Sequence, residues 1–106
     1  MNETCDPLLT CDRLVDRLRQ VLPELKQRYG IAQLGVFGSY VRGEQTPSSD
    51  LDLLIEFDPD RRFGLLSFCE LENQLSDRLG VKVDLVMKSG LKPRIGERIL
   101  AEVQYL

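Results

Sequence analysis

Two short segments of this chain carry residues that could bind a phosphate and a divalent metal. Gly38 and Ser39 follow an apolar run, and ten residues separate Ser39 from Asp50, which is followed by Asp52. A glycine after a strand lets the backbone approach a phosphate, and N–H groups that open a helical turn point at an anion. Ser39 adds a hydroxyl donor, and Arg42 could neutralise a phosphate oxygen. We therefore predict a phosphate-binding turn here.

The aspartates have a spacing that suits metal ions. Asp50 and Asp52 are alternate residues, so on a strand their side chains project from one face, roughly 7 Å apart at the backbone. Two metal ions about 3.5–4 Å apart form the arrangement that supports in-line displacement at phosphorus. Asp84, on another predicted strand, is the candidate for a third ligand. A set of oxygen ligands favours Mg²⁺ or Mn²⁺ over zinc.

Helices and strands can be expected from the spacing of apolar residues around these segments. Period two is typical of strands, and spacings of three and four are typical of amphipathic helices. We expect helices over 12–29 and 65–79 and from Pro93 onward, a helical turn over 39–42, and strands over 31–37, 51–57 and 81–87. Pro23 should kink the first helix or divide it in two. In the last helix, Ile95, Ile99, Leu100 and Val103 should point inward.

This order of elements predicts an α/β (α+β) fold with a small mixed sheet. The second and third predicted strands each have one apolar face and one face that carries aspartate. Such strands fit a sheet with helices packed on one side and an open side that bears the function. At 106 residues, the chain is expected to form a single domain over 1–106, with 1–11 as a loose tail.

Composition narrows the chemistry and the location. The chain contains no histidine, which excludes Ser–His and Cys–His catalysis within it. The net charge of −3 does not favour nucleic acid, so no direct nucleic-acid binding is expected. No signal peptide or membrane-spanning run is visible, so we expect a soluble cytoplasmic protein. Cys5 and Cys11 could pair, although reduced thiols are the simpler interpretation.

Each motif alone is common, but their combination is specific. The segment GSYVRG, the Asp-Leu-Asp that follows ten residues after Gly-Ser, and the later aspartate in VKVDLV resemble the polymerase-β-like nucleotidyltransferase superfamily. The chain is more closely similar to the minimal nucleotidyltransferases (MNT), from about Asp12 to its end, including the segment GLKPRIGERIL. It departs from that pattern at Val41, where alanine is usual before Arg-Gly.

The resemblance implies transfer of a nucleoside monophosphate from a nucleoside triphosphate. Asp50 and Asp52 would then bind both Mg²⁺ ions, and Asp84 would bind the catalytic ion and help to deprotonate the acceptor hydroxyl. Gly38 and Ser39 would hold the β and γ phosphates. We include Arg42 and Ser49 as further candidates for nucleotide binding.

The same resemblance implies a partner. Minimal nucleotidyltransferases usually accompany a HEPN-domain toxin, so the expected reaction is transfer of AMP from ATP to a tyrosine of that toxin, with the chain acting as an antitoxin. Two alternatives stay open at this point, namely neutralisation by binding alone and transfer to a small molecule. Exposed strand edges or the last helix could also support a homodimer, and no motif selects the base of the nucleotide.

Overall fold

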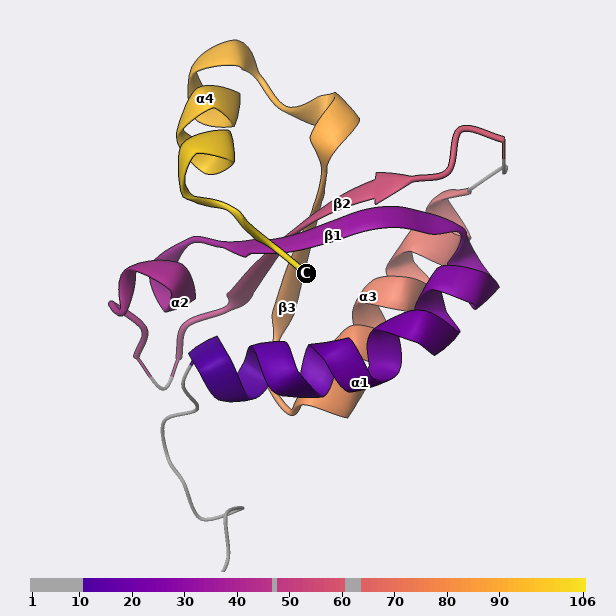
Figure 1. The fold of residues 1–106 in the computed structure, drawn as a ribbon, viewed down its shortest axis with the longest axis horizontal. Coiled ribbons are helices and arrows are strands. Elements are labelled where there is room, and N and C mark those ends of the chain that lie inside the picture. Colours follow the sequence, from indigo (N-terminus) through magenta and orange to yellow (C-terminus); the bar gives the residue numbers. More distant parts are fainter. Residues whose placement is uncertain (1–10, 47, 61–63) are drawn as a thin grey trace, which may run out of the picture.

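The computed structural model describes residues 11–46, 48–60 and 64–106 (Figure 1). Its helices are α1 (Cys11–Tyr29), α2 (Ser39–Arg42), α3 (Leu65–Leu79), a 3₁₀ turn (Lys88–Gly90) and α4 (Pro93–Glu102). Its strands are β1 (Ile31–Phe37), β2 (Leu51–Phe57), β3 (Val83–Met87) and β4 (Gln104–Tyr105). The expected order of elements is therefore confirmed, with β4 as an addition.

The four strands form one mixed sheet in the order β3-β2-β1-β4. β1 pairs antiparallel with β2 and with β4, whereas β2 and β3 are parallel. A parallel pair needs a crossover connection, and α3 supplies it between β2 and β3. The mixed sheet predicted from the sequence is thus confirmed, and it places the ends of β1, β2 and β3 side by side.

One face of the sheet is closed by α1 and α3, which lie together on that side (Figure 1). Alternate strand residues, such as Leu34, Leu53 and Leu85, point into this layer and are almost fully buried. They pack with Leu18 of α1 and Leu75 of α3, whose exposed fraction is zero. This layer is the main core of the protein and fixes the sheet beneath the candidate site.

The opposite face is covered in part by α4, which corrects the expectation of a fully open face (Figure 1). Phe37, Leu54 and Ile99 form a small buried cluster there, and Val103 packs against it. The structure contradicts the inward placement of the other two α4 residues, because Ile95 is 56% exposed and Leu100 is 47% exposed. A single helix on a sheet buries only one stripe of its surface, and Leu100 lies off the stripe that carries Ile99. Ile95 lies on that stripe, one turn nearer the start of the helix, where it borders a cavity.

Other sequence-based boundaries also need correction. β3 begins at Val83 rather than Val81. α1 begins at Cys11. Of the two outcomes predicted at Pro23, the division into two helices is contradicted, because α1 continues through Pro23 as one helix and the carbonyl group that loses its N–H partner belongs to the exposed Arg19. The rest of the predicted tail, and with it Cys5, lies outside the described residues.

The outer edge of β3 is less exposed than expected. The N–H group of Val83 donates to Ser76 Oγ at 3.0 Å, and that of Leu85 donates to Glu72 Oε2 at 2.9 Å. Side chains of α3 thus occupy two donors that an added strand would need. Across the described ranges, no helix is both long enough and apolar enough to cross a membrane.

Candidate active site

The sheet brings together acidic residues that are distant in the sequence. Asp52 of β2 is paired in register with Asp84 of parallel β3 on one side and with Phe37 of β1 on the other. Neighbouring strands lie about 4.8 Å apart, so the two aspartates are adjacent on the same face. Asp50 directly precedes β2 and is half-buried. The predicted acidic residues therefore lie at one end of the sheet.

Gly38 connects β1 to α2 in a conformation that favours glycine, with φ = 85°. A Cβ atom at this position would overlap Asp52 Oδ2 and would lie 3.1 Å from Asp52 Cβ. The backbone of the turn thus packs directly against the carboxylate. The Gly38 carbonyl oxygen accepts hydrogen bonds from the N–H groups of Val41 and Arg42, at 3.1 and 3.2 Å, which close the first turn of α2.

The charge of Asp52 is held in an unfavourable environment. Burial, followed by the charges of Asp84 and Asp50, raises the pKa of Asp52 from 3.8 to about 6, while Arg42 acts in the opposite direction. A carboxylate that is repelled by two others is stabilised by a nearby cation. The donor set, made of carboxylate oxygens, fits Mg²⁺ or Mn²⁺.

The acidic side chains share one end of the sheet without converging on a single point. Among the described residues, no three potential ligands of the types His, Cys, Asp and Glu come close enough to form a metal cluster. Asp84 is exposed and can adjust its side chain, since its backbone position beside Asp52 is set by the sheet. The fit to a metal therefore rests on donor chemistry and strand register.

A cavity of about 450 Å³ opens next to Asp52 under α4. One part of its wall is apolar and the other is charged. The lining residues are Phe37, Gly38, Arg42, Asp52, Ile95, Arg98, Ile99 and Glu102. Of the three candidate acids, Asp52 lines this cavity, whereas Asp50 and Asp84 lie outside its lining.

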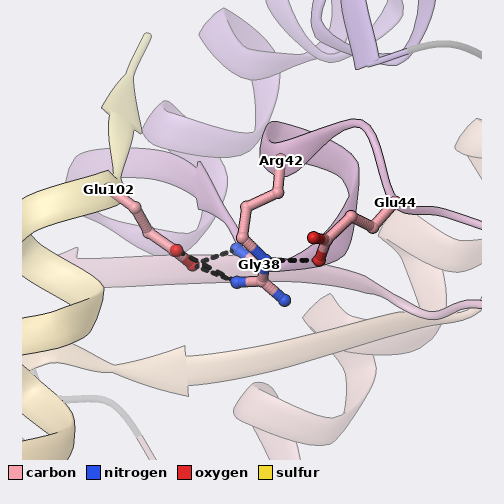
Figure 2. A network of polar contacts seen from close by, with 4 residues as sticks. All are labelled: Gly38, Arg42, Glu44 and Glu102. Carbon is pink, nitrogen blue, oxygen red and sulfur yellow. Dashed lines mark hydrogen bonds and ion pairs between the residues drawn. The ribbon is translucent and has the colours of Figure 1, made fainter.

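Glu102 is a site residue that the sequence interpretation missed. Its Oε2 atom accepts a hydrogen bond from the N–H group of Gly38 at 2.7 Å, and both its oxygens lie 3.0 Å from Arg42 Nη1 (Figure 2). Arg42 also donates through Nε to Glu44 Oε1 at 2.8 Å. Helical spacing could have suggested Glu102, because it shares a face of α4 with Ile95, Arg98 and Ile99.

The remaining candidates differ in their surroundings. Ser39 begins α2 directly after Gly38 and is half-buried. Ser49 lies in the loop before β2, where its Oγ accepts a hydrogen bond from the N–H group of Thr46 at 2.8 Å and its own N–H donates to the Thr46 carbonyl. Ser49 therefore shapes the loop that leads to Asp50, and it does not line the cavity.

Comparison with known proteins identifies the family of this chain. Residues 18–106 match the family model described as nucleotidyltransferase domain. Protein adenylyltransferase MntA of Thermococcus cleftensis is 46% identical over 99 residues, which cover 93% of this chain and 98% of the relative. A solved minimal nucleotidyltransferase structure superposes with a TM-score of 0.77 at 41% identity, covering 92% of this chain and 97% of the other.

A more distant structure has the same fold. A toxin–antitoxin complex solved with AMP-PNP superposes with a TM-score of 0.64 at 22% identity, over 92% of this chain and 72% of the matched one. The family resemblance carried by the Gly-Ser and Asp-Leu-Asp segments is thereby confirmed. The chain belongs to the nucleotidyltransferase domain family, and it is a minimal nucleotidyltransferase of the protein adenylyltransferase type.

Proposed function

We propose that this protein transfers AMP from ATP to a tyrosine of a HEPN-type toxin and thereby silences that partner. The identity of 46% to protein adenylyltransferase MntA supports the reaction class. A structure of an AMPylated HEPN toxin in complex with an MNT antitoxin has this fold and supports the choice of partner. The observation that carries the proposal is the register of Asp52 with Asp84 beside the Gly38 turn.

In this reaction the tyrosine oxygen attacks the α-phosphorus of ATP, and the bond from that phosphorus to the β-phosphate oxygen breaks. AMP becomes linked to the tyrosine, and pyrophosphate leaves. The tyrosine proton is accepted by Asp84, which lies at the exposed end of the acidic group. Gly38 and Ser39 hold the β and γ phosphates at the start of α2.

Asp50, Asp52 and Asp84 would hold two Mg²⁺ ions, for which Mn²⁺ could substitute. When bound, the ions neutralise charge on the transferred phosphate and on the leaving pyrophosphate. The residues contribute position and charge, because Asp52 packs against the Gly38 turn and this contact limits the directions that its carboxylate can take.

The acceptor comes from another molecule. The cavity beside Asp52 is bordered by Ile95 and Arg98, both exposed on α4, which leaves this side accessible to a protein surface. A tyrosine on a partner could therefore approach Asp84 and Asp52 from the side of α4. The proposed assembly is a hetero-oligomer of this chain with the toxin.

The proposal is tested by incubating the protein with ATP, Mg²⁺ and the candidate toxin, followed by intact-mass measurement of the toxin. We expect a gain of one or more AMP units, and we expect Asp50→Asn and Asp52→Asn each to slow the transfer by at least about 100-fold. Asp77→Asn, which removes an exposed carboxylate on α3, is the matched control and should transfer AMP normally. Normal transfer by both site variants would refute the proposed site.

The same variants separate catalysis from simple binding. If the Asp52→Asn protein protects cells from the toxin as well as the unchanged protein does, neutralisation by binding alone is the correct function. If protection disappears together with AMP transfer while the complex still forms, enzymatic silencing is supported. Complex formation is measured by size-exclusion chromatography of the two purified proteins.

A further inference from the structure

The contact between Glu102 and the Gly38 turn joins two parts of the chain that are 64 residues apart. The carboxylate of Glu102 is held by a backbone N–H group at 2.7 Å and by the Arg42 guanidinium at 3.0 Å (Figure 2). A backbone amide combined with a guanidinium is a typical donor set for phosphate as well as for carboxylate. Glu102 thus occupies donors that could hold a phosphate oxygen of the nucleotide.

Arg42 does not depend on Glu102 for its orientation. Its Nε atom donates separately to Glu44 Oε1 at 2.8 Å, and Glu44 is itself tied to α2, because its N–H group donates to the Ser39 carbonyl at 2.9 Å. If Glu102 withdrew, the guanidinium would keep one ion pair and present its Nη1 atom to the cavity. The site would then hold a free backbone donor and a free cationic donor.

Withdrawal of Glu102 does not require α4 to leave the sheet. The helix is anchored by Ile99 in the cluster with Phe37 and Leu54, and its last turn is closed by the Val103 N–H group on the Ile99 carbonyl at 2.8 Å. The Glu102 side chain is 24% exposed, so a change of rotamer can carry its carboxylate to solvent. The replacement of the Glu102 carboxylate by a phosphate therefore needs only a movement of the Glu102 side chain, while the backbone of α4 stays in place.

We propose that Glu102 is an internal competitor that the nucleotide must displace from the Gly38–Arg42 anion site, and that it thereby lowers the affinity of the enzyme for nucleotides with a β or γ phosphate. This inference rests on the proposed function, because it assigns the anion site to those phosphates. A ligand that does not reach the Gly38–Arg42 donors gains nothing from the removal of Glu102. A nucleoside triphosphate that uses them binds more weakly while Glu102 competes.

The test compares the binding of the ATP analogue AMP-PNP and of AMP, each with Mg²⁺, by isothermal titration calorimetry. Glu102→Gln should tighten the binding of AMP-PNP about fivefold to tenfold, since a charged hydrogen-bonded competitor is replaced by a neutral one. The affinity for AMP should stay unchanged. Glu97→Gln, which removes an equal charge at an exposed position on the same helix, should change neither affinity.

A second variant separates position from charge. Glu102→Asp keeps the carboxylate but shortens its reach by one methylene, so it should also tighten AMP-PNP binding, by less than Glu102→Gln. Thermal unfolding of each variant shows whether the fold is retained, and Glu102→Asp provides the test if Glu102→Gln does not fold.

Several results would overturn the proposal. Weaker binding of AMP-PNP by Glu102→Gln would make Glu102 a positioning residue for Arg42. An equal gain in AMP-PNP affinity in Glu97→Gln would show that the effect comes from the net charge of the protein and not from the Gly38–Arg42 contact. If the unchanged protein transfers AMP normally but Glu102→Gln leaves AMP-PNP affinity unaltered, this inference fails alone. If no variant binds AMP-PNP, the inference and the proposed function fail together.

Discussion

The two faces of the sheet are built from the same strands but bury very different side chains. Among the described residues, the face under α1 and α3 packs eighteen buried residues into one core, whereas the face under α4 buries a cluster of three. The second face also carries Asp52 and Asp84, next to a cavity lined by Arg42 and Glu102. Because side chains alternate along each strand, the residues that stabilise the fold point to one face and the candidate site residues point to the other.

This difference in burial between the two faces explains how a small chain can hold carboxylates that repel one another. Within the described residues, the buried side chains are aliphatic or aromatic, so the main core holds no charge that would need a partner. Its stability supports a second face on which burial and the charges of Asp84 and Asp50 raise the pKa of Asp52. We therefore expect substitutions on the first face to change stability and those on the second to change activity.

The largest expected effect is on the core face. Leu53→Ala should lower the free energy of unfolding by about 3–4 kcal/mol, because Leu53 is fully buried between the sheet and two helices. Leu54→Ala, its neighbour on the other face, should cost only about 2 kcal/mol, since the small cluster under α4 can collapse around the space. Urea unfolding measures both. An equal or larger loss for Leu54→Ala would contradict the division between the faces.

The next effect concerns the turn between β1 and α2. Gly38→Ala should slow AMP transfer by about 100-fold, equivalent to about 2.7 kcal/mol, because the added Cβ displaces the Asp52 carboxylate. Gly43→Ala is the matched control. Gly43 also has a positive φ of 72°, but a Cβ there meets no atom within 4 Å.

Gly43→Ala should therefore lose about 1–2 kcal/mol of stability from its left-handed backbone. Gly38→Ala should lose at least as much, because positive φ combined with a ψ of −155° is a conformation that only glycine readily adopts, and it alone should lose activity. Thermal unfolding and the intact-mass assay measure the two quantities on the same samples. Full activity of Gly38→Ala would show that Asp52 tolerates displacement. A loss of activity in Gly43→Ala would show that strain alone impairs the site.

A smaller effect is expected in the pH dependence of stability. The pKa of Asp52 is about 6 in the folded protein, against an ordinary value of 3.8, so the folded state binds this proton more tightly than the unfolded chain does. The resulting stabilisation is complete below about pH 4 and is lost as the pH rises through 6. Asp52→Asn removes this loss and should be more stable than the unchanged protein at pH 8, by about 1 kcal/mol after allowance for solvent screening.

At pH 4 the difference should disappear, because Asp52 is then largely protonated in the folded protein. Thermal unfolding at the two pH values checks the sign. The same variant is expected to be inactive, so stability and activity should move in opposite directions at this position. A destabilised Asp52→Asn protein at pH 8 would show that the carboxylate is satisfied rather than repelled.

Much of the fold could be predicted because apolar periodicity reports on burial against a large surface. The strand over residues 31–37 and the helix over 65–79 have the predicted bounds. The aspartates at positions 50, 52 and 84 could be proposed as candidates because a Gly-Ser turn, two alternate aspartates after it and an aspartate on a later strand form a specific combination. The predictions failed where a contact depends on tertiary placement, as for Ile95 and Leu100, which have helical periodicity but no surface to cover.

The predicted site was incomplete for a related reason. Helical spacing places Glu102 on the same face of α4 as Ile99, but its partners are a backbone N–H group and an arginine 60 or more residues away, which spacing alone does not indicate. β4 has only two residues, and it depends on the close crossing of β1 at Gly35, where a Cβ would lie 2.6 Å from Val103 Cγ2. Contacts of this kind follow from the path of the chain and become visible only in three dimensions.

The smallest expected effect tests whether the charge of Asp84 acts on the carboxyl group of Asp52. Asp84→Asn should lower the pKa of Asp52 while leaving it above 3.8, because burial is the largest cause of its shift and Asp50 remains. The pKa of Asp52 can be followed by the NMR titration of its carboxyl carbon. Glu56→Gln, at an exposed position on the same face of β2, is the control and should leave this pKa unchanged. An unchanged pKa in Asp84→Asn would mean that the Asp84 carboxylate turns away from Asp52, and Asp50 would then be the one candidate aspartate that acts on Asp52.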